Sequence, residues 1–442
     1  MPPMQAGQRQ PRHFTMGPSV PPHLPILDFA LADDPVQRPA LLNQLREALF
    51  DVGFLYIKNH GVSSSIITHL TSRLPALFDL PTDIKADLSK LNSPHFLGYS
   101  GFAEETTLGQ KDLREQFDFA TELPVVYKPA EGRRNSASSN SNAGSSRDFS
   151  QLYWRLRGPN QWPPEALLPG FRQALETYHD ALQALSYRFV HLVEEAFGIP
   201  VGTFDQFFRS DNRSISDDPR LVSDKPTTTR LTYLPPQHRI KLLKYPPNSN
   251  NCGQGVGPHK DSSGWLTFLL QIGQEAGLEV LAADGETWIP APPIDDTFVV
   301  NFGNAFEAAT EGAVKATVHR VAAPPPSSPA RYSIPFFQGL PLDMTVSEIR
   351  SYMPLSVRTL RRQQQNSSSP SKHDSQDNQT DAAGKPSEND ARSAEKVGDT
   401  VSSFLDARWD ALGESQLRKW IRSHEDVGRR WYGDDVVRYY AG

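Results

Sequence analysis

The sequence predicts a mainly β protein with helices, in the α+β class. Short apolar runs divided by proline and glycine follow one another from residue 230 onward, and a long helical pattern precedes them at residues 171–196. Strands of this length and spacing are typical of an all-β sandwich, a jelly roll or a barrel, and they argue against alternating strand–helix units. We therefore expect a β-rich core with helices beside it.

The N-terminal part begins with a strand, a helix and a second strand. Residues 25–29, PILDF, predict a short strand. Residues 37–53 repeat leucine and alanine at helical spacing up to Gly53, which predicts a helix that ends before this glycine. Residues 53–62, GFLYIKNHGV, predict a strand closed by a His-Gly turn, so we interpret His60 as a structural turn residue.

Residues 171–196 predict one long amphipathic helix. Its apolar side chains recur every three or four positions, at Phe171, Leu175, Tyr178, Leu182, Leu185, Phe189, Leu192 and Val193. This period places them on one face of an α-helix. We interpret the helix as a packing element.

The second half of the chain contains the strand-like runs on which the fold class depends. They are RLTYL (230–234), RIKLLKY (239–245), WLTFLLQ (265–271), GLEVL (277–281), TFVVNFG (297–303), KATVHRVA (315–322) and RYSIPFFQ (331–338). In a strand, successive side chains point to opposite faces of the sheet. In WLTFLLQ one face is plainly apolar, and burial of both faces fits the run.

Charge and composition narrow the classes of partner. The chain has 45 basic and 51 acidic residues and a net charge of −6 without a strong basic block, which argues against nucleic acid or an anionic membrane surface as partner. No run reaches the roughly 18 apolar residues of a membrane span. Cys252 is the only cysteine, which excludes an intramolecular disulfide and fits a reducing compartment. We expect a cytoplasmic protein, a monomer by default, that binds a small molecule or a protein.

Three segments differ from the rest in composition. Residues 1–24 are rich in proline, residues 130–149 contain NSASSNSNAGSS, and residues 362–399 are rich in serine, asparagine and glutamine. Because they lack the apolar side chains that offset the entropy of ordering, we expect a disordered tail and two disordered insertions. An ordered body over about residues 25–361 and a C-terminal piece over about 400–442 remain.

The C-terminal piece carries tryptophans at a regular spacing. Trp409, Trp420 and Trp431 lie 11 residues apart, close to three helical turns. This spacing predicts a helical seam that packs onto the body. One hypothesis is that the segment closes a substrate pocket.

Three residues near the predicted strands form a candidate metal site. His259 and Asp261 are two apart in an extended segment, so their side chains point to the same side. His319 follows Asp261 by 58 residues, enough chain for the intervening strands to cross the sheet and return. Two imidazoles and one carboxylate at an open site are the ligand set of non-haem Fe(II) oxygenases. The alternative interpretation is an ordinary charged corner at the start of a strand.

A second pair of residues follows the last histidine. Arg331 and Ser333 lie two apart on the next predicted strand, starting 12 residues after His319, and face one way. A guanidinium with an adjacent hydroxyl can hold a carboxylate. A metal site together with a carboxylate clamp is what a keto-acid co-substrate requires.

Several of these motifs resemble a known family. GPHKDSSGWLTFLLQ, VVNFGNAFEAATEGAVKATVHRV and ARYSIPFF resemble the C-terminal domain of 2-oxoglutarate/Fe(II)-dependent dioxygenases of the isopenicillin N synthase-like superfamily. PILDF, LFDVGFLYIKNHGV, GYSGFAEETTLGQKDLREQFDFATE and LKYPP resemble its N-terminal region and the strand before its metal motif. The resemblance covers most of residues 25–345, in the right order.

The resemblance implies an arrangement of the chain. It implies a double-stranded β-helix (jelly-roll) core flanked by N-terminal helices and a C-terminal helical extension. Residues 25–229 would be the N-terminal dioxygenase region and 230–345 the Fe(II)/2-oxoglutarate domain, with residues 346–361 and 400–442 as the extension.

The resemblance also implies roles for individual residues. His259, Asp261 and His319 match the iron ligands. Arg331 with Ser333 matches the clamp for the distal carboxylate of 2-oxoglutarate, and Tyr245 matches a tyrosine that contacts this co-substrate. Leu243 stands where the family usually has asparagine, which removes a polar contact there. Because Asp261 is intact, the resemblance favours hydroxylation or desaturation over halogenation.

The expected activity is therefore the Fe(II)- and O₂-dependent oxidation of a small organic molecule, coupled to decarboxylation of 2-oxoglutarate to succinate. Ascorbate is expected as an added reductant. The Ser- and Asn-rich insertions are reminiscent of fungal proteins, whose relatives often serve secondary metabolism. One alternative is an iron oxidase of the same fold that does not use 2-oxoglutarate. The other alternative is a non-catalytic jelly-roll binding protein. A zinc hydrolase is disfavoured because no His-Glu-x-x-His helix is present.

Five further residues have weaker functional interpretations. Phe302 and Asn304 could border the site, although a strand end and a turn explain them equally well. By family analogy Phe102, Phe117 and Phe119 could line the substrate pocket, but aromatic residues at strand spacing are more often part of the core.

Overall fold

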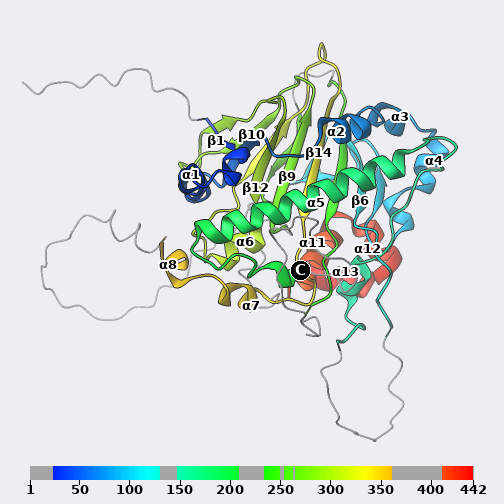
Figure 1. Cartoon of the computed structure of the whole chain (residues 1–442). Coiled ribbons are helices and arrows are strands. Elements are labelled where there is room, and N and C mark those ends of the chain that lie inside the picture. The colour runs from blue at the N-terminus through cyan, green and yellow to red at the C-terminus, as the bar shows by residue number, and fades with distance from the viewer. Residues whose placement is uncertain are drawn as a thin grey trace, which may run out of the picture.

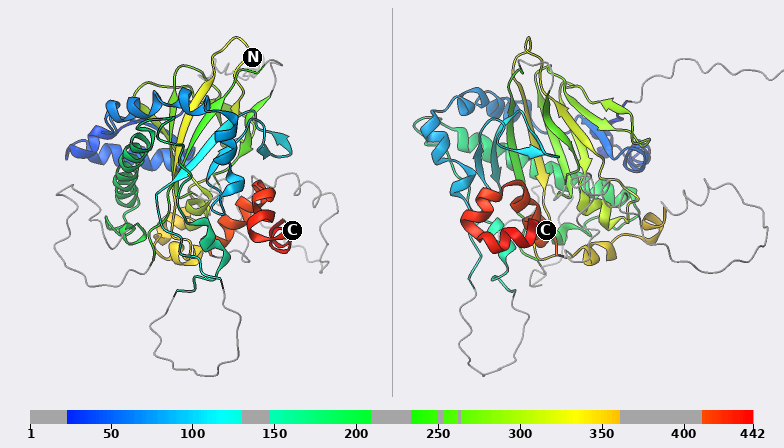
Figure 2. Two further views of the ribbon diagram at one scale, coloured as in Figure 1. Left: turned by 90° about the vertical axis from the view of Figure 1, so that its right-hand side faces the viewer. Right: turned by 180° about the vertical axis from the view of Figure 1, so that it is seen from behind.

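Two facing β-sheets form the centre of the molecule (Figure 1). The computed structural model describes residues 23–129, 147–208, 233–248, 253–261, 264–360 and 411–441. Within these residues, the long helix α5 (Phe171–Ala196) covers the outer face of the larger sheet. The smaller sheet and the C-terminal helices lie on the opposite side of the larger sheet (Figure 2).

In the described residues the larger sheet has eight strands, in the spatial order β1-β2-β12-β9-β14-β7-β6-β3. Their bounds are β1 (Ile26–Asp28), β2 (Phe54–Lys58), β12 (Thr297–Phe302), β9 (Leu266–Ile272), β14 (Arg331–Gln338), β7 (Arg239–Tyr245), β6 (Glu115–Ala120) and β3 (Gly98–Ser100). All neighbouring strands pair antiparallel except β1 and β2, which are parallel.

The smaller sheet has four strands in the described residues, in the order β11-β10-β13-β8. They are β11 (Trp288–Pro290), β10 (Leu278–Leu281), β13 (His319–Ala322) and β8 (Gln254–His259). From β7 to β14 the chain passes back and forth between the two sheets, with β10 and β11 as one hairpin of the smaller sheet. This alternation is the topology of a double-stranded β-helix, so the expected α+β class with a jelly-roll core is confirmed.

The strand alternation in the sequence explains why the larger sheet is buried on both faces. In β12, Phe298, Val300 and Phe302 face the helices, whereas Val299 and Asn301 face the smaller sheet. In WLTFLLQ the apolar face is buried, with Phe268 against Phe189 of α5, whereas the opposite face is only partly buried at Leu269 and Gln271. The odd-numbered residues of these strands are therefore available to line a cavity between the sheets.

Further helices surround the sheets. They are α1 (Arg38–Asp51), α2 (Ser64–Thr71), α3 (Leu74–Phe78), α4 (Thr82–Asp87), α6 (Asn304–Ala309), α7 (Val346–Ser351) and α8 (Leu355–Arg358). Single 3₁₀ turns are η1 (Phe29–Asp33), η2 (Lys90–Asn92), η3 (Leu152–Leu156) and η4 (Asp205–Phe207), and β4 (Thr106–Thr107) and β5 (Gln110–Lys111) form a short hairpin. The predicted packing role of residues 171–196 is confirmed, because the apolar face of α5 lies in the main core.

Three C-terminal helices form a separate packed group, α11 (Leu412–Ser423), α12 (Glu425–Tyr432) and α13 (Asp434–Ala441). Most of their buried apolar side chains form one cluster with η3 and Phe96, whereas Leu412 belongs to the main core. Trp420 and Trp431 belong to this cluster or pack against it, which confirms the predicted seam for these two residues. Trp409 lies outside the described residues.

The structure corrects some of the expected strands. In RLTYL, Tyr233 and Leu234 lie in no strand; Pro235 and Pro236 follow directly and have no N–H to donate. The strand expected over 315–322 begins only at His319. The strand β8 was not expected, because its glycines and proline disfavour strand formation.

Most of the three segments expected to be disordered, and Cys252, lie outside the described residues. The described residues reach into two of these segments at their edges. Leu24 is buried between the two sheets, and Arg147 forms an ion pair with Asp343. His60, expected as a turn residue, does follow β2 and packs edge-on against Phe298.

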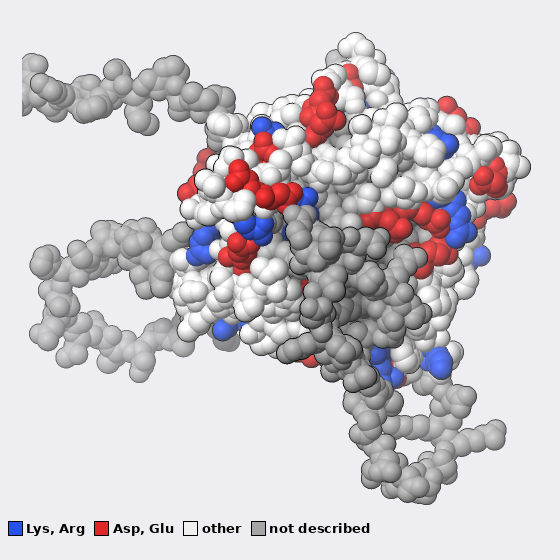
Figure 3. All heavy atoms as spheres, in the orientation of Figure 1, with Lys and Arg blue, Asp and Glu red and all other residues white. Residues whose placement is uncertain are grey.

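The surface fits the mixed charge of the sequence. Figure 3 shows acidic and basic side chains scattered over the described part of one face. Among the described residues, no helix has the length and apolar character needed to cross a membrane.

We predict that the C-terminal cluster contributes strongly to stability. Leu417 of α11 is fully buried in it, so Leu417→Ala is expected to lower the free energy of unfolding by about 2–5 kcal/mol. Leu355→Ala, at a leucine that is 65% exposed on α8, is the matched control and should change this value by less than about 0.5 kcal/mol. Urea-induced unfolding measures both. Equal effects of the two substitutions would contradict the prediction.

Candidate active site

A cavity of about 190 Å³ lies between the two sheets. Its walls come from the inner faces of β7, β9, β12 and β14, from β8 and β13 of the smaller sheet, and from α11 at one end. His259, Asp261 and His319 all line it. The helical segment expected to close a pocket therefore does form part of this cavity wall, through Trp420 among others.

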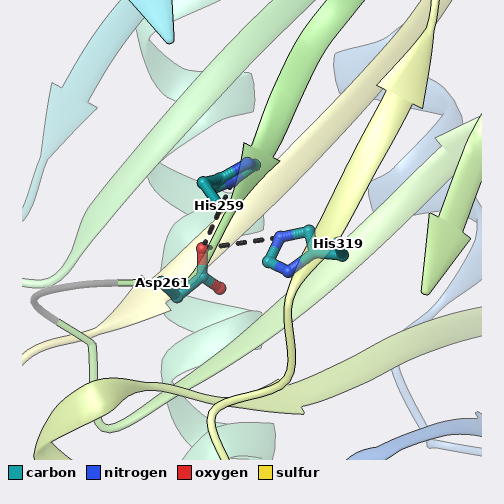
Figure 4. A group of neighbouring side chains, drawn as sticks. All are labelled: His259, Asp261 and His319. Atoms are coloured by element: carbon teal, nitrogen blue, oxygen red, sulfur yellow. Dashed lines mark ion pairs between the residues drawn. The ribbon is translucent and has the colours of Figure 1, made fainter. Parts of the chain in front are cut away.

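The three candidate metal ligands converge in this cavity (Figure 4). His259 is the last residue of β8, Asp261 follows two residues later, and His319 is the first residue of β13. His319 and His259 lie directly opposite each other in the antiparallel β8–β13 pair. The Nε2 atoms of His259 and His319 lie 3.9 and 3.7 Å from Asp261 Oδ1.

Backbone carbonyls orient both imidazoles. The Nδ1 atom of His259 lies 2.8 Å from the carbonyl oxygen of Gly257, and that of His319 lies 3.1 Å from the carbonyl oxygen of Thr317. A carbonyl oxygen only accepts, so each Nδ1 carries the proton and donates it. Each Nε2 is then an unprotonated donor atom that faces the common centre, the arrangement that metal-binding histidines adopt.

The carboxylate of Asp261 is held from the larger sheet. Its Oδ2 accepts hydrogen bonds of 2.7 Å from Thr267 Oγ1 on β9 and from Asn301 Nδ2 on β12. Burial alone would raise the pKa of Asp261, but the two histidines and these two hydrogen bonds outweigh it and hold the pKa below its ordinary value. Asp261 is therefore ionised, with Oδ1 directed toward the histidines.

The donor set fits a divalent iron ion. Burial, assisted by His319, lowers the pKa of His259 to about 3, so its imidazole stays neutral as a metal ligand requires. One ionised carboxylate supplies the negative charge. The three candidate ligand atoms lie within 4.8 Å of one another, so one ion between them can reach all three. Two histidines and one carboxylate are the facial set typical of non-haem Fe(II).

The other predicted pair lines the same cavity. Arg331 and Ser333 of β14 are buried and stand opposite Tyr245 and Leu243 of β7. Arg331 Nη1 lies 3.4 Å from Ser333 Oγ, Arg331 Nη2 donates to Gln271 Oε1 at 2.8 Å, and the guanidinium lies 5.0 Å from the centre of the Tyr245 ring.

Arg331 has no carboxylate ion pair among the described residues. Its Nε is buried without a hydrogen-bond partner in them, and burial lowers the pKa of this guanidinium despite the attraction of Tyr245. A buried cation of this kind requires a compensating anion, which a ligand carboxylate would supply.

Sequence reasoning missed the residues that support the two groups. Thr267, Asn301 and Gln271 make the contacts that orient Asp261 and Arg331, and only strand register brings them there. Asn301 lies within VVNFGNAF, in which only Phe302 and Asn304 were expected to border the site. Phe302 belongs to the main core, and Asn304 contacts the site through its backbone N–H, which donates to the carbonyl of Asp261.

The suggested pocket phenylalanines are not part of the cavity wall. Phe117 and Phe119 are buried in the main core, and Phe102 is 54% exposed at the surface. Their assignment to the core, which the sequence favoured, is borne out for Phe117 and Phe119.

Comparison with known proteins decides the family. Residues 24–165 match the family model described as "non-haem dioxygenase in morphine synthesis N-terminal", and residues 228–339 match the 2OG-Fe(II) oxygenase superfamily. The 2-oxoglutarate-dependent dioxygenase frbJ of Dothideomycetidae sp. (strain 11243) is 35% identical over 95% of this chain and 94% of its own length. The chain belongs to the 2-oxoglutarate- and Fe(II)-dependent oxygenase family.

Two further comparisons agree with this family. A 2-oxoglutarate-dependent dioxygenase of Gibberella zeae is 32% identical over 76% of this chain and 80% of its own length. A full-length protein of Neurospora crassa, whose structure was solved in complex with alpha-KG, has the same fold, with a TM-score of 0.54, 22% identity and coverage of 74% of this chain and 91% of that chain. As a 2-oxoglutarate-dependent oxygenase, the protein is an oxidoreductase that uses Fe(II), 2-oxoglutarate and O₂.

We predict that the hydrogen bond from Thr267 is needed for tight iron binding. Thr267→Val keeps the size of the side chain but removes a donor to Asp261 Oδ2, so Fe(II) affinity, measured by anaerobic titration, is expected to fall about tenfold. The matched control is Thr297→Val on β12, since Thr297 donates to the carbonyl of Ile294 and not to Asp261. Equal affinities of the two variants would contradict the prediction.

Proposed function

We propose that the chain binds Fe(II) through His259, Asp261 and His319 and oxidises a small organic molecule by hydroxylation or desaturation, with conversion of 2-oxoglutarate to succinate. The observation that carries this proposal is one cavity that holds both the convergent donor set and the buried Arg331–Ser333 pair. An intact carboxylate at Asp261 favours these oxidations over halogenation.

In this proposal, each residue that lines the site has a separate role in binding or positioning. When bound, iron together with 2-oxoglutarate supplies the O₂-dependent oxidation of a substrate C–H bond. Arg331 and Ser333 hold the distal carboxylate of 2-oxoglutarate, and Tyr245 packs beside the guanidinium and restricts its position. Leu243, in place of the family's asparagine, leaves an apolar patch beside this site. Thr267 and Asn301 keep Asp261 Oδ1 directed toward the metal position.

The expected alternative, an oxidase of the same fold in which Arg331 holds a carboxylate of the substrate itself, is not favoured, because both relatives described above are 2-oxoglutarate-dependent dioxygenases. The burial of Arg331, its contacts with Gln271 and Tyr245, and its place in the cavity that holds the candidate metal ligands support 2-oxoglutarate as its partner. Stoichiometric formation of succinate with each turnover distinguishes the two.

The proposal also covers the type of substrate, the oligomeric state and the compartment of the protein. We infer a small-molecule substrate of fungal secondary metabolism, because both relatives described above come from fungi and the Ser- and Asn-rich insertions are typical of fungal proteins. We also propose a monomer that acts in the cytoplasm without nucleic acid. A single cysteine, a net charge of −6 and the lack of a strong basic block support this setting.

We predict that Arg331 governs the affinity for 2-oxoglutarate. Anaerobic addition of Fe(II) and 2-oxoglutarate to the wild type should give the weak visible charge-transfer band of the chelate. Arg331→Ala should need at least about tenfold more 2-oxoglutarate for the same band, because a charge-assisted contact is lost. The control is Arg188→Ala, which removes a partly exposed arginine of α5 that pairs with Asp33. Iron binding without the band in the wild type would favour the oxidase.

We predict that Asp261 is needed for metal binding. Asp261→Asn is nearly isosteric but removes the only anionic donor of the set, so the rise in Tm on anaerobic addition of Fe(II) to the wild type should be lost. The control, Asp295→Asn, changes an exposed aspartate that contacts Gln274 and should keep the rise. A full rise in Tm for Asp261→Asn would show that iron binds elsewhere.

A further inference from the structure

The strand β7 carries a row of side chains from the co-substrate end of the cavity to its helical end. Arg239, Lys241, Leu243 and Tyr245 share the cavity-facing side of the strand and all line the cavity. Tyr245 stands beside Arg331. Arg239 is six residues away, roughly 20 Å along the strand, under Trp420 of α11. The two ends of the row therefore belong to different parts of the cavity.

Buried charges surround this row. We define the β7 charge cluster as the cations Lys90, Arg114, Arg239 and Lys241 and the carboxylates Glu105, Asp112 and Asp118. Four cations face three carboxylates, which leaves one positive charge in excess. His424, which also lines the cavity, adds none, because burial lowers the pKa of its imidazole.

Ion pairs account for every member of the cluster except Arg239. Lys241 lies 2.8 Å from Asp118, and Lys90 lies 2.7 Å from both Asp118 and Glu105. Arg114 lies 2.8 Å from Glu105 and 3.4 Å from Asp112. The three carboxylates are thus all paired, and the excess positive charge is that of Arg239.

Arg239 is held in place but not neutralised. It donates only to backbone carbonyls, those of His95, Phe96 and Leu156, at 2.8, 3.2 and 3.3 Å, and its guanidinium lies 4.4 Å from the centre of the Trp420 ring. Among the described residues no carboxylate forms an ion pair with it. A guanidinium has five N–H donors, so about two remain available.

The electrostatics of Arg239 agree with a binding position for an anion. Burial lowers the pKa of Arg239 to about 10, and the attraction of Asp118 and Tyr432 does not offset it. Lys419 of α11 also lines this end of the cavity, and its positive charge acts on His259. Gln237, two residues before Arg239, lines the cavity as well, and its Oε1 is buried without a partner in the described residues.

We propose that Arg239 receives a carboxylate of the substrate, so that the enzyme acts on a small organic acid whose acid group lies under Trp420 at the helical end of the cavity. This inference rests on the proposed function, because it concerns the substrate of the same site. Arg239 is a specificity residue here and takes no part in the oxidation.

The charge of the cluster favours a monoanion. Within the cluster, the one positive charge in excess is neutralised by a carboxylate, whereas a phosphate dianion would place a second negative charge beside Glu105, Asp112 and Asp118. A cationic substrate would add a second positive charge in excess without a free partner, because all three carboxylates already have cationic partners.

The test compares acids with their amides on the wild-type enzyme. The protein is loaded anaerobically with Fe(II) and a small excess of 2-oxoglutarate, so that Arg331 is occupied. It is then titrated calorimetrically with acetate, benzoate and phenylacetate, and with acetamide, benzamide and phenylacetamide, each up to about 10 mM. At least one acid should bind, and it should bind about tenfold or more tightly than its amide. Binding of none of the acids, or equal binding of acid and amide, would overturn the proposal.

Three variants locate the bound acid. Arg239→Gln should lose the acid–amide difference, and Arg239→Lys should keep part of it. Lys244→Gln is the control of equal charge change on the same strand, because Lys244 faces away from the cavity and pairs with Glu115. A full acid–amide difference in Arg239→Gln would overturn the proposal. If Arg239→Gln fails to fold, the proposal is still tested by the difference in affinity between acid and amide, measured for the wild type and for Arg239→Lys.

The visible charge-transfer band of the Fe(II)–2-oxoglutarate chelate allows failure of this inference to be distinguished from failure of the proposed function. A normal band without preference for acids would refute only the substrate class. Failure of the wild type to form the band would instead refute the role proposed for the metal and 2-oxoglutarate, whatever acids bind.

Discussion

The geometry of the site depends on the two hydrogen bonds that hold the Asp261 carboxylate. Its Oδ2 is fixed to Thr267 and Asn301 of the larger sheet, and its Oδ1 faces histidines that are paired on the smaller sheet. The carboxylate therefore spans the gap between the sheets. A small sliding of one sheet over the other would separate the donors, so the apolar packing between the sheets acts directly on the metal position.

Uncompensated buried charge marks where ligands belong in this cavity. Burying a charge without a partner is costly, and proteins normally pair such groups. Here most of the charged groups that line the cavity are paired within the protein, whereas Arg331 and Arg239 have no carboxylate partner in the described residues. According to the two proposals above, each arginine would receive its compensating negative charge from a bound anion. The two proposed anion positions lie at opposite ends of one cavity.

The sequence predicted the parts of the structure that depend on local patterns. The period of α5, the alternation in β9, and the two-residue spacing of His259 and Asp261 are all visible within a short stretch. A local sequence pattern does not predict the structure where pairing between distant strands determines it. β8 has too much glycine and proline to look like a strand, yet pairing with β13 makes it one. Asn301 reaches Asp261 only because β12 pairs with β9 in one register.

Arg331 and Arg239 also differ in whether a local sequence pattern reveals them. Arg331 belongs to a short motif, Arg-x-Ser, whose chemistry can be recognised along the chain. Arg239 belongs to no motif, and its meaning depends on which residues surround it: a tryptophan from the C-terminal helix α11, carbonyls from three other residues, and carboxylates already taken by other cations. Residues that perform the shared chemistry can therefore be found from sequence. Residues that select the substrate are defined by the elements added around the core, so they become visible only in the folded chain.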